Sequence, residues 1–305
     1  PAVLCLTSRK EHTMINLCRA SARGLSAALS LLTLALVAGG ISTARAAGPI
    51  PDKGLEAAVR QQVFEKRDKP DELTEDDLKK VFILEGRNKG IKDLTGLEKC
   101  PNLALINLAG NEIEKVDALK DLKTLQSLDL SKNKIVDIAP LASVKALQFV
   151  ELSDNQIASV EPLADMPKLS ALYIAGNKLT TAAPLAKLPK LSSLDLARNQ
   201  LTEVKDLAGV IPNLMTFKIT GNKVADLTPF AAAAPRMLLL MENNAITDLA
   251  PLVEACKKDA EGEKRFAPFL RLYLAGNPLS DAAKGPQLEA LKAAGVKIIL
   301  ENDKK

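Results

Sequence analysis

Residues 125–135 read LQSLDLSKNKI and residues 191–201 read LSSLDLARNQL, so the same apolar skeleton ending in Asn returns three times 22 residues later. A search for Asn followed two residues later by Ile, Leu or Val extends this pair to a series. Its members are Asn111, Asn133, Asn155, Asn177, Asn199, Asn222, Asn244 and Asn277. Successive members are 22 residues apart, except for one gap of 23 and a last gap of 33. A fixed period of this length indicates a repeat architecture.

Each repeat predicts a short strand followed by helical turns. Apolar residues stand five and three positions before the Asn, as Leu128 and Leu130 do before Asn133. Two apolar residues separated by one other are typical of a strand, because side chains alternate between its faces. After the Asn, the apolar spacing changes to three, which favours 3₁₀ or irregular helical turns. Five repeats carry proline seven residues after the Asn, where it suits the first residue of such a turn. These prolines are Pro140, Pro162, Pro184, Pro229 and Pro251.

The pattern resembles the leucine-rich repeat, LxxLxLxxNxI, in its 22-residue form, and is similar to that of internalins and of the leucine-rich regulatory subunit of protein phosphatases. The resemblance covers about residues 81–300. It implies an α/β fold: a right-handed solenoid with a parallel sheet on its concave face, short 3₁₀ or irregular turns on its convex face, and helical caps at both ends. Stacked repeats would supply the core that one repeat cannot form alone.

About nine repeats are expected over residues 81–280, including a degenerate first repeat with Lys89 in place of the Asn. We expect the Asn side chains to be structural. An inward amide can satisfy backbone N–H and C=O groups where each strand turns away from its neighbours.

Both ends of a solenoid need covering. Residues 47–80 are expected to form a helical N-terminal cap, in which Thr74 and Asp77 fit a variant of the capping box. Residues 54–66 have the pattern of an amphipathic helix. Its apolar side is expected to comprise Leu55, Val59, Val63 and Phe64. Residues 281–305 are expected to form a C-terminal cap, with a helix that stops at Gly295 and a final strand.

The last regular repeat is lengthened by eleven residues near 256–266, which read CKKDAEGEKRF. We interpret them as a solvated extension of the helical return. A lateral arm that contacts a partner is the alternative.

Residues 1–46 are expected to be a leader that contains a secretory signal peptide starting at Met14. Arg19 and Arg23 form its positive region, residues 25–37 its apolar stretch, and residues 44–46 (ARA) a small-x-small cleavage site. We therefore expect cleavage after Ala46 and a secreted or periplasmic mature protein. An uncleaved membrane anchor is the alternative, although a membrane span needs about 20 apolar residues.

The remaining composition disfavours several classes of function. Residues 1–46 hold five basic and one acidic residue, so the rest of the chain, with 36 of each, has no net charge. A nucleic-acid partner is not expected, because it requires a concentrated basic surface. The only His is His12, in the leader, so the common general base and metal ligand is missing from the repeats. We expect no enzyme activity, cofactor or metal, and a monomer without membrane contact in the mature form.

Two cysteines lie outside the leader. Cys100 and Cys256 would be about seven repeats apart, too far for a disulfide. We expect both to be unpaired core residues.

The residues that vary between repeats are the ones that could recognise a partner. The residue between two core-facing apolar residues points outward from the strand. Four positions before the Asn, this row reads Asn107, Asp129, Glu151, Tyr173, Asp195, Lys218, Leu240 and Tyr273. Six positions before the Asn, the row reads Leu105, Ser127, Phe149, Ala171, Ser193, Thr216, Leu238 and Arg271. The row two before the Asn is mostly Ala, Ser or Thr.

These rows predict a concave strip that is acidic in its middle and has an aromatic pair beside the acids. The candidate partner-binding residues are Asp129, Phe149, Glu151, Tyr173, Asp195, Lys218, Arg271 and Tyr273. Tyr and Arg are frequent binding anchors. The alternative is that the aromatic residues only favour strand packing, while the acids keep the sheet soluble.

The sequence therefore predicts a non-catalytic, exported scaffold for protein–protein interaction that binds a protein or peptide on its concave face. An intracellular regulatory subunit of a phosphatase-like enzyme is the alternative. An enzyme with a solenoid body is disfavoured, because no His lies beyond residue 12.

Overall fold

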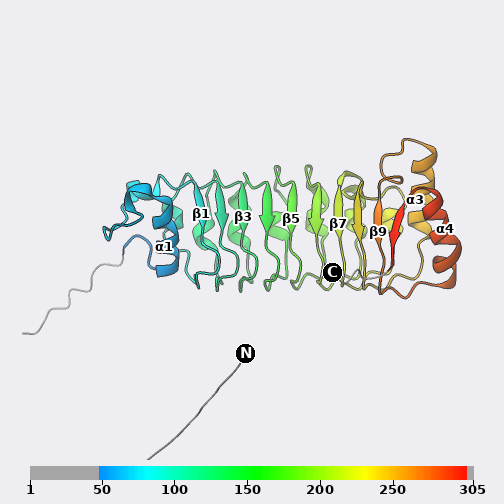
Figure 1. Ribbon diagram of the computed structural model, residues 1–305, viewed down its shortest axis with the longest axis horizontal. Helices are drawn as coiled ribbons and strands as arrows, with labels where there is room; N and C mark the ends of the chain where they lie inside the picture. The colour runs from blue at the N-terminus through cyan, green and yellow to red at the C-terminus, as the bar shows by residue number, and fades with distance from the viewer. Residues whose placement is uncertain (1–47, 301–305) are drawn as a thin grey trace, which may run out of the picture. The chain divides into compact units, whose positions relative to one another are not determined.

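The computed structural model describes residues 48–300, which belong to one compact unit, residues 46–305. The predicted leader, residues 1–46, lies outside the described residues. Ten short strands form one parallel sheet whose strand order follows the sequence (Figure 1). The strands are β1 (Ile83–Glu85), β2 (Leu105–Asn107), β3 (Ser127–Asp129), β4 (Phe149–Glu151), β5 (Ala171–Tyr173), β6 (Ser193–Asp195), β7 (Thr216–Lys218), β8 (Leu238–Leu240), β9 (Arg271–Tyr273) and β10 (Lys297–Ile299).

The strands pair in the register that the repeat predicts. Leu128 pairs with Val150, 22 residues later, and both are fully buried at the centre of their strands. The two irregular gaps leave this register intact: Ser193 pairs with Thr216, and Leu238 pairs with Arg271. Additional residues are therefore accommodated in the return segments and not in the sheet.

Short 3₁₀ helices carry the chain back from one strand to the next. They are η2 (Leu97–Lys99), η3 (Asp117–Leu119), η4 (Ala139–Ser143), η5 (Glu161–Leu163), η6 (Ala183–Lys187), η7 (Lys205–Gly209), η8 (Ile211–Asn213) and η9 (Thr228–Phe230). The five predicted prolines lie in the first turn of η4, η5, η6, η9 and the helix α3 (Ala250–Glu261), which confirms their role. Their missing N–H would have no helical partner there.

The repeat Asn side chains are structural, as predicted. Oδ1 of Asn133 accepts the N–H of Ile113 at 3.0 Å, and Nδ2 donates to the carbonyls of Leu108 and Leu130 at 3.1 and 2.9 Å. The other seven make equivalent bonds. One amide thus joins two repeats at the turn after each of the strands β2–β9. Within residues 48–300, every buried side-chain nitrogen or oxygen has a hydrogen-bond partner.

The residue immediately before each of these Asn positions, and before Lys89 of the first repeat, has a left-handed backbone conformation, with φ between 52° and 73°. Gly fills four of the positions and other residues fill five. They are Asn88, Gly110, Lys132, Asp154, Gly176, Arg198, Gly221, Asn243 and Gly276. This conformation turns each chain out of its strand.

The N-terminal end of the sheet is covered by α1 (Lys53–Gln62), which packs against β1 and is followed by η1 (Phe64–Lys66). Leu55, Val59 and Val63 are buried, as predicted, but Phe64 is 79% exposed and the prediction for it was wrong. The helix ends at Gln62, and Val63 has an extended backbone, so Phe64 no longer follows the helical periodicity. Its ring lies under the guanidinium of Arg67, whose Cζ is 5.6 Å from the ring centroid.

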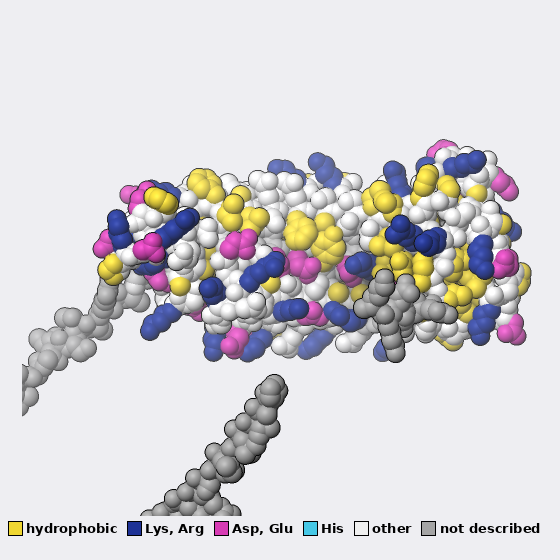
Figure 2. Space-filling model, in the orientation of Figure 1, with side chains coloured by type: hydrophobic (Ala, Val, Ile, Leu, Met, Phe, Trp, Pro, Cys, Tyr) yellow, Lys and Arg dark blue, Asp and Glu magenta, His cyan; other side chains and the backbone are white. Residues whose placement is uncertain are grey.

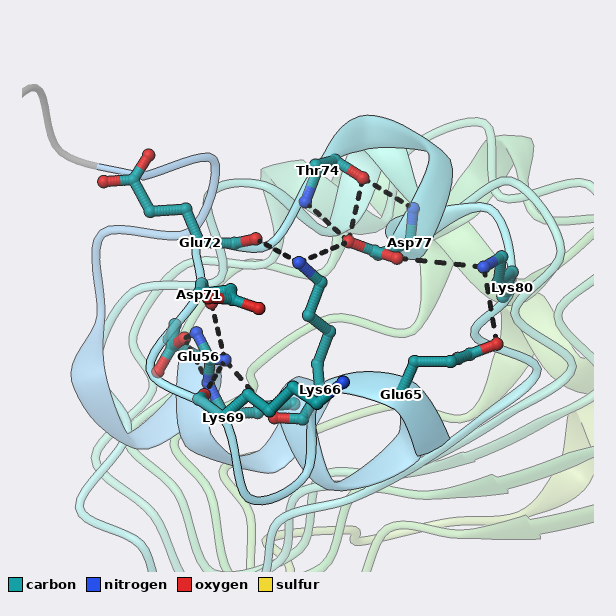
Figure 3. A network of polar contacts seen from close by, with 10 residues as sticks. Glu56, Glu65, Lys66, Lys69, Asp71, Glu72, Thr74, Asp77 and Lys80 are labelled. Atoms are coloured by element: carbon teal, nitrogen blue, oxygen red, sulfur yellow. Dashed lines mark hydrogen bonds and ion pairs between the residues drawn. The ribbon is translucent and has the colours of Figure 1, made fainter.

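The predicted capping box begins α2 (Glu75–Leu78). Thr74 Oγ1 accepts the N–H of Asp77, and Asp77 Oδ2 accepts both the N–H and the hydroxyl of Thr74 (Figure 3). Burial pushes the pKa of Asp77 upward, but these hydrogen bonds and the ammonium groups of Lys66 and Lys80, each 3.8 Å away, hold it below the ordinary value.

The C-terminal end is covered by α3, by a π-helical turn (Ala283–Gln287) and by α4 (Leu288–Ala293), which precedes β10 (Figure 1). Gly295, with φ of 95°, ends this helix as predicted. The additional residues near 256–266 lengthen α3 and then form a loop. The buried carboxylate of Asp259 closes that loop by accepting the N–H groups of Arg265, Phe266 and Ala267 at 2.9–3.0 Å.

Candidate functional site

The outward side chains of β1–β10 form one continuous surface, which we call the sheet face. In β2–β8 the central residue of each strand is buried, and the residues on either side of it are half-buried or exposed. Because the strands pair in register, the two outward rows expected from the sequence are aligned across the sheet. Tyr173 pairs with Glu151 and Tyr273 with Leu240, so both tyrosines lie in the same row.

An aromatic pair lies near the middle of the sheet face. The ring centroids of Phe149 and Tyr173 are 5.5 Å apart, with the ring planes inclined by 47°. Phe149 is 37% exposed, and its neighbours in register are the small residues Ser127 and Ala171. With a small residue on either side, the Phe149 ring keeps much of its surface available to a bound molecule.

The acids of the strip are not equivalent. Asp129 is 3.2 Å from the guanidinium of Arg87, and Asp195 is 3.2 Å from the ammonium of Lys218. Glu151 accepts hydrogen bonds from the N–H and side chain of Ser153, which are neutral groups. Burial raises the pKa of Glu151, and repulsion from Asp129 and Asp195 adds to this effect.

The C-terminal half of the sheet face carries several large apolar side chains. Leu238 and Leu240 are half-buried on β8, and Leu240 pairs with Tyr273. Three large apolar side chains just before the strands are exposed: Met215 by 38%, Met237 by 53% and Phe269 by 63%. Figure 2, which views this face, shows hydrophobic side chains near its middle and again toward the C-terminal end. Arg271 and Lys297 are exposed and pair in register at this end.

Comparison with known proteins agrees with this architecture. The family described as Leucine Rich repeats (2 copies) matches at residues 101–143, 123–165, 145–187 and 167–209. The internalin InlF of Listeria monocytogenes strain 4b F2365 is 25% identical, with a TM-score of 0.64 over 85% of this chain and 79% of that one. Internalin C2 of the same strain is 26% identical, with a TM-score of 0.61 over 82% of this chain and 94% of that one.

The chain is a leucine-rich repeat protein. Its fold is of the internalin type. The leucine-rich repeat ectodomain of the Arabidopsis thaliana receptor kinase GASSHO1/SCHENGEN3, solved in complex with CASPARIAN STRIP INTEGRITY FACTOR 2, shares the fold at 20% identity. Its TM-score is 0.51, over 68% of this chain and 28% of that one. No curated protein sequence matches the chain.

Sequence reasoning placed the eight candidate residues on one face of this leucine-rich repeat protein, but it missed others that shape the face. Arg87 neutralises Asp129 from the degenerate first repeat, two positions before Lys89. Extending the row two before the Asn into that repeat could have revealed it. Met215, Met237 and Phe269 precede their strands, outside the rows considered, and only the structure shows their exposure.

Two further features bear on chemistry. Within residues 48–300, no cluster of His, Cys, Asp and Glu side chains is arranged to hold a metal ion. Cys100 and Cys256 are free and fully buried, as predicted, and burial raises the pKa of each thiol to about 12. Both thiols are therefore uncharged at neutral pH, which makes them poor nucleophiles.

Proposed function

We propose that this leucine-rich repeat protein is an exported, non-catalytic scaffold that binds a protein or peptide partner through the sheet face. The contact between Phe149 and Tyr173 is the observation that carries the proposal. These two aromatic side chains contact each other and are partly exposed near the middle of the sheet face, whose strands pair in register. Aromatic residues are enriched among the anchors of protein interfaces.

The apolar side chains on the C-terminal half of the sheet face support a protein partner. Met237 and Phe269 expose more than half of their side-chain surface beside Leu238 and Leu240. Contiguous exposed apolar surface is unfavourable in water and commonly marks an interaction site. Methionine side chains also adapt to different partner shapes because they are flexible and polarisable.

The stacked repeats favour binding by a rigid surface. Strands β2–β9 are fixed by backbone pairing on both sides, and the turn after each of them is fixed by hydrogen bonds of the repeat Asn. Little ordering of this surface is then required on association, which reduces the entropic cost of binding. The rigid face therefore suits recognition rather than catalysis.

Export is supported by the signal-peptide features of residues 1–46. In the part of the chain that the structure describes, no helix is long and apolar enough to cross a membrane. N-terminal sequencing of the protein from its native cell tests export: a start at Ala47 is expected. An uncleaved chain recovered from the cytoplasm would instead favour the intracellular regulatory-subunit alternative.

Capture of partners from native cells tests the binding face. Tagged wild type would be compared with Leu238→Ser plus Leu240→Ser on the sheet face, and with Val136→Ser, a 59% exposed apolar side chain outside the strands. The sheet-face variant is expected to lose the captured partner while Val136→Ser retains it. Circular dichroism of each variant checks that the solenoid is intact. Retention of the partner by the folded sheet-face variant would refute the proposed face.

A further inference from the structure

The charges on the middle of the sheet face leave one carboxylate without a counter-charge. Arg87 pairs with Asp129 and Lys218 pairs with Asp195, each at 3.2 Å. Glu151 lies on β4, between these two pairs, and within residues 48–300 it forms no ion pair with a lysine or arginine. The negative charge available to a partner is therefore concentrated at Glu151.

Aromatic surface surrounds this carboxylate. Tyr173 is directly opposite Glu151 on β5, and Phe149 lies two residues before Glu151 on the same face of β4. The two rings contact each other with centroids 5.5 Å apart. Ser127 and Ala171, which flank Phe149 in register, are too small to cover its ring, and Tyr173 is half-buried. A carboxylate and two partly open ring surfaces therefore occupy one small area of the sheet face.

This combination suits a cation on an apolar stem. A guanidinium can stack on an aromatic ring while it donates two hydrogen bonds to a carboxylate. The methylene stem of the side chain can lie along the ring edges. A neutral or acidic side chain would leave Glu151 half-buried without compensation for its charge.

We propose that Glu151, Phe149 and Tyr173 form a recognition slot for an arginine side chain of the protein partner. The guanidinium lies on the aromatic pair and binds the Glu151 carboxylate. This inference rests on the proposed function and specifies which chemical group of the partner binds the sheet face. Asp129 and Asp195 are already paired with Arg87 and Lys218. Glu151 is therefore the carboxylate that is free to bind the guanidinium of the partner.

The tyrosine content of the chain allows a direct test. The whole sequence contains two tyrosines, Tyr173 in the slot and Tyr273 in the same row. In register, Tyr273 has only the apolar neighbours Leu240 and Ile299, so it serves as an internal control on the same face. Selective ¹³C labelling of tyrosine gives two sets of ring signals, and Tyr173→Phe assigns them.

The probe is N-acetyl-arginine amide, and N-acetyl-citrulline amide is its uncharged isostere. The Tyr173 ring signals are expected to shift saturably with the arginine probe, while those of Tyr273 stay unchanged. The arginine probe is expected to bind roughly three- to tenfold more tightly than the citrulline probe. In Glu151→Gln, which keeps the shape of the side chain, that preference is expected to disappear. Lys134→Gln, at an exposed residue outside the strands, should leave it unchanged.

Three results would overturn the slot: no shift at Tyr173, equal shifts with both probes, or an unchanged preference in Glu151→Gln. Failure of the proposed function is seen separately, through partner capture by the Leu238→Ser plus Leu240→Ser variant. If that variant loses the partner while Glu151→Gln keeps it and shows no arginine preference, the binding face stands and the slot is refuted.

Discussion

The guanidinium of Arg198 donates a hydrogen bond of 2.7 Å to Oδ1 of Asp154, two repeats earlier in the solenoid. Gly176 belongs to the repeat between them, and all three residues have left-handed backbone conformations. A Cβ atom on Gly176 would overlap Oδ1 of Asp154 and lie 3.1 Å from Nη2 of Arg198. The ion pair therefore spans a repeat that lacks a side chain at this position.

Substitution of Gly176 by alanine is expected to destabilise the protein more than the same change at Gly221. Both residues have positive φ, 65° and 70°, so either alanine should cost about 1–2 kcal/mol of backbone strain. At Gly221 the nearest atom to a new Cβ is 3.5 Å away, whereas at Gly176 the new atom displaces the ion pair. Loss of an exposed pair adds about 0.2–1 kcal/mol. Urea denaturation measures the difference, and equal midpoints would contradict this explanation.

The Asn155 side chain is expected to contribute more to stability than any exposed amide. Its Oδ1 accepts the N–H of Ile135, and its Nδ2 donates to the carbonyls of Leu130 and Leu152, all at 3.0 Å. Asn155→Ala leaves these buried groups unpaired, and we expect a loss of about 2–4 kcal/mol in the free energy of unfolding. Gln156→Ala is the matched control, because Gln156 is exposed. A similar effect of both substitutions would show that the Asn bonds are not structural.

The strand register and the role of the Asn could be predicted because they depend on a repeated pattern. The Asn position recurs in eight copies, seven of them buried, so its structural role can be recognised from its period. Phe64 could not be placed correctly, because its exposure depends on where α1 ends, and no repeat constrains that point. The sequence predicted an acidic middle of the strip without a counter-charge for Asp129, because the cation that neutralises Asp129 comes from Arg87, 42 residues away in sequence.

Glu151 is expected to cost the protein stability at neutral pH. Burial raises its pKa above the ordinary 4.5, and the nearby carboxylates of Asp129 and Asp195 raise it further. The ionised form is therefore disfavoured in the folded state, and this cost disappears as the pH falls from above the folded pKa toward 4.5. Arg87 and Lys218 also carry charge on this face, but each is paired with an aspartate.

We therefore expect Glu151→Gln to be more stable than wild type at neutral pH, with a difference that vanishes near pH 4.5. Denaturation midpoints at several pH values measure this. A variant that is less stable than wild type at neutral pH would contradict the assignment of Glu151 as an uncompensated charge.

Cys100 and Cys256 are expected to resist alkylation in the folded protein. Both side chains are fully buried, and a thiol pKa of about 12 leaves almost no thiolate at pH 8. Treatment with iodoacetamide, followed by peptide mass spectrometry, should detect modification of these two residues only after denaturation. Stoichiometric labelling of either residue under native conditions would mean that its repeat opens.

Site-specific photocrosslinking in the native cell tests the central claim, partner binding by the sheet face, most directly. A photoreactive amino acid would replace Ser193, a half-buried residue on β6 of that face, and, in a second chain, the exposed Val136 outside the strands. The proposal predicts a discrete protein adduct from position 193 and none from position 136. An adduct from position 136, with none from position 193, would contradict it.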